Sequence, residues 1–124
     1  MGSNPIIWKG TIHGEPASKA NSRRLVMFGV RPASIKSKKA LDYAVAAWAQ
    51  LPVLDPLFKE NVSIEIDIYY ASRRPDLDES LILDVMQKRI YNNDRQVRTK
   101  HIYWHLDRAN PRAEIVLRAW EGRQ

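Results

Sequence analysis

The chain has 124 residues, a length that fits one domain, and 44% of them are hydrophobic, which is enough for a core of its own. Its 20 Lys and Arg residues outnumber 14 Asp and Glu, and this net charge of +6 favours a polyanionic partner, with a merely soluble basic protein as the alternative. The absence of cysteine excludes disulfides, thiolate catalysis and zinc–thiolate sites, and it fits a cytoplasmic location. We expect no membrane span and no signal peptide, because no apolar run approaches the roughly 20 residues that a bilayer requires.

The first strand is predicted at residues 6–13, where Ile6, Trp8 and Ile12 share one face by the period of two. A polar and basic stretch, 19–24, follows, and the four apolar residues after it form a short strand. A run of like charges is most often a solvated loop, so this is the alternative to a role in ligand binding for that stretch.

The clearest helix is predicted at residues 37–51, with Ser37 as its N-cap and Pro52 ending the run. Its apolar stripe follows helical spacing and consists of Ala40, Ala44, Ala47, Trp48 and Leu51. The most regular strand is predicted at 62–70, where apolar residues alternate with polar ones. Its buried face comprises Val62, Ile64, Ile66 and Ile68.

A second helix is predicted at residues 77–90. Its apolar row is Leu77, Leu81 and Val85. Asp78 or Ser80 caps its start, and Asp84 stands four residues before Lys88, a spacing typical of an ordinary ion pair on a helix.

Two further strands are predicted at 101–106 and 113–120, joined by a short turn at Asn110 and Pro111. The short turn indicates that they form an antiparallel pair. The whole chain, 1–124, is thus predicted to be a single α+β domain: a mixed sheet of about four or five strands with two α-helices.

Acidic residues gather around the second helix, within an otherwise basic chain. Asp76 and Asp78 follow the strand at 62–70, and Asp94 follows the helix. Clustered carboxylates repel one another unless a cation neutralises them, and hard cations such as Mg²⁺ prefer these oxygen ligands. A helix of ten residues is about 15 Å long, so Asp94 reaches Asp78 within one chain only if the helix is short and the chain doubles back. Otherwise Asp94 would serve a partner subunit.

The segment 73–97 resembles the RusA family of Holliday junction resolvases. The resemblance rests on Asp76-x-Asp78 after a strand, a helix, and Asp94-x-Gln96-Val97 after a polar turn. It extends more weakly upstream, where 16–21 is similar to the family's Pro/Ser/Asn loop. It implies that the three aspartates are catalytic and bind Mg²⁺ or Mn²⁺.

The sequence departs from the family pattern after the second aspartate. Family members commonly carry Asn-Leu and then a lysine implicated in catalysis, whereas Glu79, Ser80 and Ile82 occupy these positions here. Lys88 is too far along the helix to replace that lysine, but Lys19 or Lys100 could approach in the fold. Glu79 is either a fourth carboxylate ligand or a residue that favours the helix dipole. Asp84 matches a helix aspartate of the family.

The resemblance implies an endodeoxyribonuclease that resolves four-way (Holliday) DNA junctions by paired symmetric phosphodiester hydrolysis, in DNA recombination and repair. A two-fold symmetric substrate suits a homodimer, and small resolvases of this type are typical of phages and prophages. The residues assigned to DNA are Arg73, Arg74, Arg95, Arg98, Lys19, Arg23, Arg24 and Lys100, with Asn21 in the upstream loop. The alternatives are a catalytically impaired dimer that binds branched DNA, and a basic structural protein whose aspartates are caps and turns.

Overall fold

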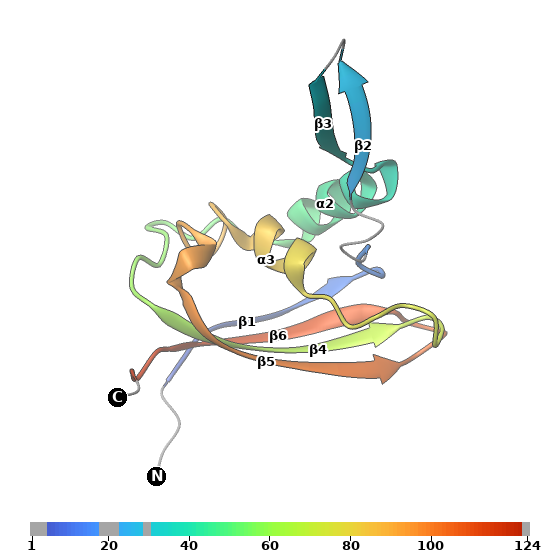
Figure 1. Cartoon of the computed structure of the whole chain (residues 1–124). Coiled ribbons are helices and arrows are strands. Elements are labelled where there is room, and N and C mark those ends of the chain that lie inside the picture. Colours follow the sequence, from blue (N-terminus) through green and yellow to red (C-terminus); the bar gives the residue numbers. More distant parts are fainter. Residues whose placement is uncertain (1–4, 18–22, 29–30, 123–124) are drawn as a thin grey trace.

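A computed structural model describes residues 5–17, 23–28 and 31–122. Its elements are β1 (Ile6–His13), β2 (Arg23–Phe28), β3 (Arg31–Lys36), α2 (Lys38–Gln50), β4 (Val62–Tyr70), α3 (Ser80–Met86), η1 (Asp94–Gln96), β5 (Val97–Leu106) and β6 (Arg112–Ala119). Four strands form a mixed sheet in the order β1-β6-β4-β5, and β2 and β3 form a separate hairpin. The predicted α+β fold with a mixed sheet and two helices is confirmed. Both helices lie on the same side of the sheet (Figure 1).

The core lies between the sheet and the two helices. Apolar residues at alternate positions of β4, from Val62 to Ile68, are all 0% exposed, as the alternation predicts. From α2, Ala40, Ala44 and Ala47 pack onto this layer, because small side chains let the helix approach closely. The Ser37 hydroxyl accepts a hydrogen bond from the Ala40 N–H, so the predicted N-cap is confirmed. Trp48 differs from the prediction, because it remains 42% exposed.

The predicted bounds of β1 are confirmed, but its predicted face is wrong at one end. Ile12 is fully buried and Trp8 packs against the core, whereas Ile6 is 48% exposed. The pairing between β1 and β6 shifts between Ile6 and Trp8. Such an irregularity breaks the period of two, so Ile6 no longer shares the face of its neighbours.

The predicted antiparallel pairing of the last two strands is wrong. β6 pairs with β1 and β4, whereas β5 lies on the far side of β4 and runs parallel to it. The connection therefore passes the end of β4, where the Asp107 N–H donates to the Tyr70 carbonyl at 2.8 Å. Two strand spacings are about 10 Å, a distance that a five-residue connection spans easily.

The second helix is shorter than predicted. α3 begins at Ser80, and Leu77, which was expected to start its apolar row, is 40% exposed. After Met86 the chain reverses through Lys88, whose φ of 64° lies in the left-handed region. Lys88 then bonds Asn92 instead of forming the predicted ion pair with Asp84. A short helix followed by a chain reversal is the geometry that was required for Asp94 to return toward Asp78.

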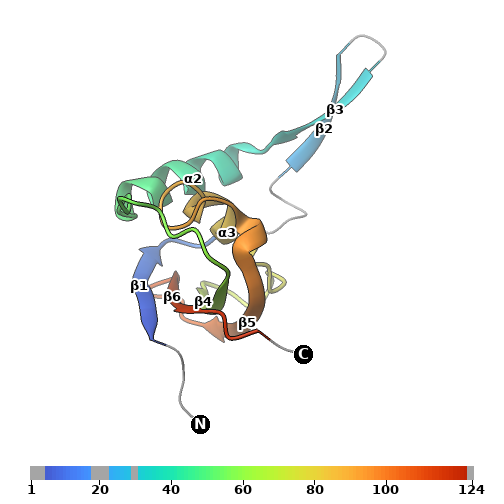
Figure 2. The ribbon, with the colours of Figure 1, turned by 90° about the vertical axis from the view of Figure 1, so that its left-hand side faces the viewer.

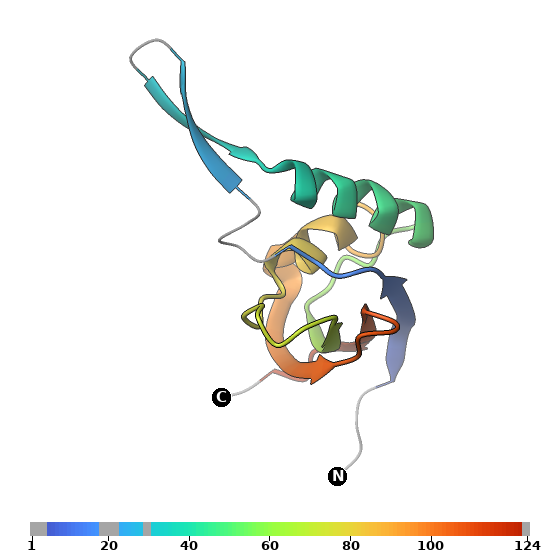
Figure 3. The ribbon, with the colours of Figure 1, turned by 90° about the vertical axis from the view of Figure 1, so that its right-hand side faces the viewer.

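The hairpin of β2 and β3 projects as an arm from the body of sheet and helices (Figures 2 and 3). Its antiparallel ladder runs from Arg23 opposite Lys36 to Phe28 opposite Arg31. The alternative that Arg23 and Arg24 belong to a loop is therefore wrong, since both lie in a strand. Lys19 and Asn21 fall outside the described residues. None of the described helices combines the length and the apolar character that crossing a bilayer requires.

Candidate functional site

The Asp-x-Asp segment is held by a buried tyrosine at the end of β4. The Tyr70 hydroxyl donates to the Asp76 carbonyl at 3.1 Å and accepts from the Asp78 N–H at 3.2 Å. Burial raises the pKa of the Tyr70 phenol, so it stays protonated and can donate. The Asp78 N–H lowers this pKa, and the carboxylates of Asp78, Glu15 and Glu79 raise it, which places three acids around one hydroxyl.

Segment 75–79 runs along β5 in the opposite direction to that strand. The Trp104 indole N–H donates to the Pro75 carbonyl at 3.1 Å, and Lys100 Nζ lies 2.6 Å from Glu79 Oε2. Asp78 Oδ1 accepts from both the N–H and the hydroxyl of Ser80. Asp78 therefore forms the local turn that leads into α3, and β5 places a cation beside the next residue.

Asp94 is positioned by two glutamines. Gln96 is 9% exposed, and its Oε1 accepts from the N–H groups of Asn92 and Asn93 at 2.9 Å. Its Nε2 donates to the carbonyls of Phe58 and Glu60 at 2.8 Å. The Asp94 N–H donates to Gln87 Oε1 at 3.1 Å. The Asp-x-Gln pattern thus has a structural cause, because the glutamine fixes the turn that carries the aspartate.

A second buried tyrosine lies between Asp94 and Asp84. The Tyr91 hydroxyl donates to the Leu83 carbonyl at 2.8 Å. Burial raises the pKa of Tyr91, and the nearby carboxylates of Asp94 and Asp84 raise it further. Asp84 and Asp94 thus both lie near the Tyr91 phenol. The acids of this region form one group around Tyr70 and another around Tyr91.

The two groups do not merge into one cluster. Across residues 5–17, 23–28 and 31–122, no three His, Asp or Glu side chains lie close enough together to hold one metal ion. The three aspartates fit a hard divalent cation, because such cations prefer carboxylate oxygens as ligands. Asp76 is exposed, and Asp78 and Asp94 are half-buried. The closure of the three aspartates into one metal centre stays a prediction.

Five of the basic residues assigned to DNA flank this region, and Arg23 and Arg24 lie instead on the hairpin of β2 and β3. Arg73 and Arg74 are exposed in the loop that precedes the Asp-x-Asp segment. Arg95 is exposed on η1, and Arg98 and Lys100 are exposed on β5, an edge strand of the sheet. The crossover from β4 to β5 therefore carries cations at both of its ends, next to the acidic groups.

Sequence reasoning missed the residues that support the aspartates. The sequence pattern places Tyr70 and Trp104 in strands and indicates no role for Gln87. A signal was present at Tyr70, which occupies a buried position that isoleucine fills elsewhere in β4. A buried tyrosine in such a row requires a partner for its hydroxyl.

The family model described as endodeoxyribonuclease RusA matches residues 13–118, a span that includes the three aspartates, Gln96 and Lys100. No curated protein sequence matches the chain significantly.

Proposed function

Because the chain belongs to the RusA family of endodeoxyribonucleases, we propose that it is a divalent-metal-dependent nuclease that resolves four-way DNA junctions by paired, symmetric cuts. The observation that carries this proposal is the crossover from β4 to β5. In this crossover, the backbone groups of Asp76 and Asp78 are hydrogen-bonded to the Tyr70 hydroxyl. Asp94 lies on a turn fixed by Gln96, and exposed arginines flank the crossover.

Asp76, Asp78 and Asp94 would hold Mg²⁺ or Mn²⁺. When bound, such an ion supplies an activated water and stabilises the leaving oxygen of the phosphodiester. Tyr70 keeps the backbone of the Asp-x-Asp segment in place, and Gln96 does the same for the turn of Asp94. Arg73 and Arg74 bind phosphates on one side of these acids, and Arg95 and Arg98 bind them on the other.

Lys100 takes the place of the lysine that the α3 sequence lacks. Ile82, at the position of the family's helix lysine, is 0% exposed, so this position points into the core. Lys100 instead approaches the same loop from β5 and pairs with Glu79, the residue after Asp78. Its side chain is 46% exposed, so it remains accessible to a phosphate. The buried Ile82 is also the observation that favours the second candidate, a dimer that binds branched DNA without cutting it.

A homodimer follows from the symmetry of the substrate. A four-way junction has two equivalent strands to cut, and a two-fold dimer presents two identical sites. Recognition would rest on phosphate contacts and on the branched shape, because phosphate contacts position the protein but do not read sequence.

A junction-cleavage assay tests the proposal directly. The protein is incubated with a synthetic four-way junction and with linear duplex of the same sequence, with Mg²⁺, with Mn²⁺ and with chelator. We expect symmetric nicks in the junction that require a divalent ion. Tight junction binding without nicks under either ion would establish the second candidate, and equal affinity for junction and duplex at moderate salt would reject both.

The variant Asp78→Asn tests the site. Asparagine keeps an Oδ1 acceptor for Ser80, so the turn into α3 is preserved while the charge is lost. We expect cleavage to fall by at least about a hundredfold, because supporting residues of metal sites alone cost about 10–100-fold. Glu65→Gln is the matched control, since Glu65 lies on the sheet face opposite the helices. Unchanged cleavage by Asp78→Asn would remove Asp78 from the site.

A further inference from the structure

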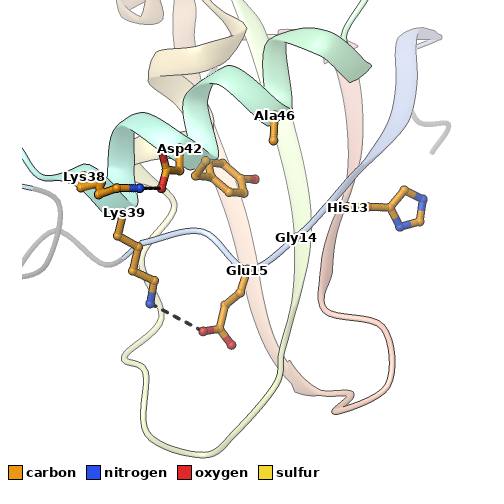
Figure 4. A pocket seen from close by; sticks show the side chains of 8 residues that line it. His13, Gly14, Glu15, Lys38, Lys39, Asp42 and Ala46 are labelled. Atoms are coloured by element: carbon orange, nitrogen blue, oxygen red, sulfur yellow. Dashed lines mark hydrogen bonds and ion pairs between the residues drawn. The ribbon is translucent and has the colours of Figure 1, made fainter.

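A slot of about 470 Å³ lies between the end of β1 and α2, outside the acidic region (Figure 4). One wall is the segment from His13 to Glu15, and the other is the α2 face that carries Tyr43 and Ala46. In Figure 4, Ala46 points from α2 toward the Gly14 segment. Gly14 has a φ of 110°, and a Cβ there would lie 3.9 Å from the Tyr43 ring. The volume falls in the range of small-molecule sites, about 300–1,000 Å³.

The two ends of the slot are closed differently. At the end of α2, Gln50 Oε1 accepts from the His13 N–H at 2.7 Å and its Nε2 donates to the His13 carbonyl at 3.1 Å. At the start of α2, Lys39 Nζ lies 3.9 Å from Glu15 Oε1, which is too long for a hydrogen bond. The first end is therefore fixed by two hydrogen bonds, and the second by a long ion pair whose lysine is exposed, which a ligand can displace.

Glu15 connects the slot to the acidic region. Its Oε2 accepts from the Ala71 N–H at 2.7 Å, at the start of the loop that carries Arg73, Arg74 and the Asp-x-Asp segment. Its Oε1 faces Lys39 and keeps its capacity to accept. Among the described residues, the Tyr43 hydroxyl is the one buried side-chain polar atom without a hydrogen-bond partner. The slot thus combines apolar walls with the Glu15 Oε1 oxygen, and its rim carries Lys39 and the ion pair of Lys38 with Asp42 at 2.8 Å.

We infer that this slot receives an unstacked nucleobase of the DNA substrate and favours cytosine and adenine over thymine. The inference rests on the proposed nuclease function and adds a base-reading site to it. The apolar walls suit the faces of a base. Lys39, whose ion pair with Glu15 is long, suits its phosphate, whereas Lys38 is paired with Asp42. A carboxylate oxygen accepts from the amino group at N4 of cytosine or N6 of adenine, whereas it repels the O4 carbonyl oxygen that thymine presents instead. Enzymes that act on a single base likewise take it out of the stack and bind it in a pocket.

Nucleotide binding can be measured on the full chain without cleavage. Backbone amide NMR is recorded while dCMP, dAMP, dTMP or deoxyribose 5-phosphate is added in the absence of divalent ions. We expect saturating shifts at Gly14, Glu15 and Ala71 with dCMP and dAMP, and about fivefold weaker binding of dTMP, the effect of one hydrogen bond. Equal shifts with deoxyribose 5-phosphate would show a phosphate site, and no shifts would show no site; either result overturns the inference.

Two variants sharpen the test. Ala46→Leu fills the slot from an exposed helix position and should abolish the shifts, whereas Ala49→Leu, also exposed on α2 but outside the slot, should keep them. Glu15→Gln keeps an acceptor for the Ala71 N–H and places an amide donor where Oε1 stood. We expect this variant to reverse the preference toward dTMP. An unchanged preference would reject Glu15 as the base-reading group.

The nucleotide titration can reject the slot without rejecting the proposed nuclease function, and the junction-cleavage assay can do the reverse. A protein that cuts junctions but shows no base-dependent shifts retains the proposed function and lacks this site. A protein that binds dCMP at Gly14 and Glu15 but never nicks DNA retains the slot and lacks the nuclease activity. In a protein that does both, Ala46→Leu should change the positions of the nicks along the junction arms, and Ala49→Leu should not.

Discussion

The Tyr70 hydroxyl shows how single polar atoms organise this protein. It is almost wholly enclosed, yet it bonds two backbone groups of the Asp-x-Asp segment, one as donor and one as acceptor. The three aspartates could be recognised in the sequence as candidate metal ligands, because hard cations prefer carboxylate oxygens. Their supports could not be predicted, because a hydrogen bond from β4 to a loop depends on tertiary packing. The predicted roles of Asp76, Asp78 and Asp94 stay predictions.

Gln96 provides the clearest test of a supporting residue. Gln96→Ala leaves two N–H groups and two carbonyls without partners, so we expect a loss of about 2–4 kcal/mol in the free energy of unfolding. Gln87→Ala removes one bond to the Asp94 N–H and should cost about 1 kcal/mol. Urea unfolding followed by tryptophan fluorescence measures both. Equal losses in the two variants would contradict the role of Gln96 as the centre of this turn.

Lys100 can be tested separately from DNA affinity. Lys100→Met keeps the length of the side chain but removes the cation beside Glu79. We expect cleavage of bound junction to fall by about 10²-fold, the scale at which one electrostatic group contributes to catalysis. Single-turnover cleavage at saturating protein measures this, and Lys100→Arg should recover part of the rate. A loss of junction affinity with an unchanged single-turnover rate would make Lys100 a phosphate contact.

At the level of elements, regular patterns were predicted well and irregular ones were not. The alternation in β4 and the alanine stripe of α2 each fix a buried face, and both are confirmed. α3 was predicted too long, because Leu77 matches the helical row although it lies in the preceding loop. Periodicity alone cannot detect that the Asp78 side chain bonds Ser80 and forms a turn there instead.

The end of α3 stores strain that can be removed. Lys88 has a φ of 64°, which costs a residue with a Cβ about 1–2 kcal/mol and costs glycine much less. Lys88→Gly should therefore be about 1 kcal/mol more stable to unfolding than Lys88→Ala, with a higher melting temperature than that variant. Lys88→Ala is the control, because it removes the bond to Asn92 but keeps the Cβ. If both variants are destabilised equally, the backbone at Lys88 is not strained.

At the scale of the whole molecule, the order of the strands in the sheet could not be predicted from the sequence. The short link from β5 to β6 is compatible with neighbouring strands and with strands separated by β4, since five residues span both distances. The structure favours the second arrangement because the isoleucines of β4 then occupy a central position, covered by the helices. The same arrangement makes β5 an edge strand, with Arg98 and Lys100 at the border of the sheet.

The charge distribution predicts how binding responds to salt. If Arg73 and Arg74 bind phosphates, Arg73→Ala with Arg74→Ala should reduce the slope of log K against log salt by about 0.9 for each phosphate that the variant no longer neutralises. Lys9→Ala, an exposed change on β1 at the opposite edge of the sheet, should leave the slope unchanged. Junction binding measured between low and moderate salt gives both slopes. If the double variant shows the same slope as the unchanged protein, these arginines are excluded from the DNA interface.

The parallel pairing of β4 with β5 also bears on the order of folding. Parallel neighbours cannot form from a local hairpin, because the whole crossover must first be closed at a cost in chain entropy. That crossover is the segment that contains every candidate metal ligand. We therefore expect the acidic region to be assembled only when this non-local pairing forms, so that nuclease activity cannot be acquired before β5 has docked on β4.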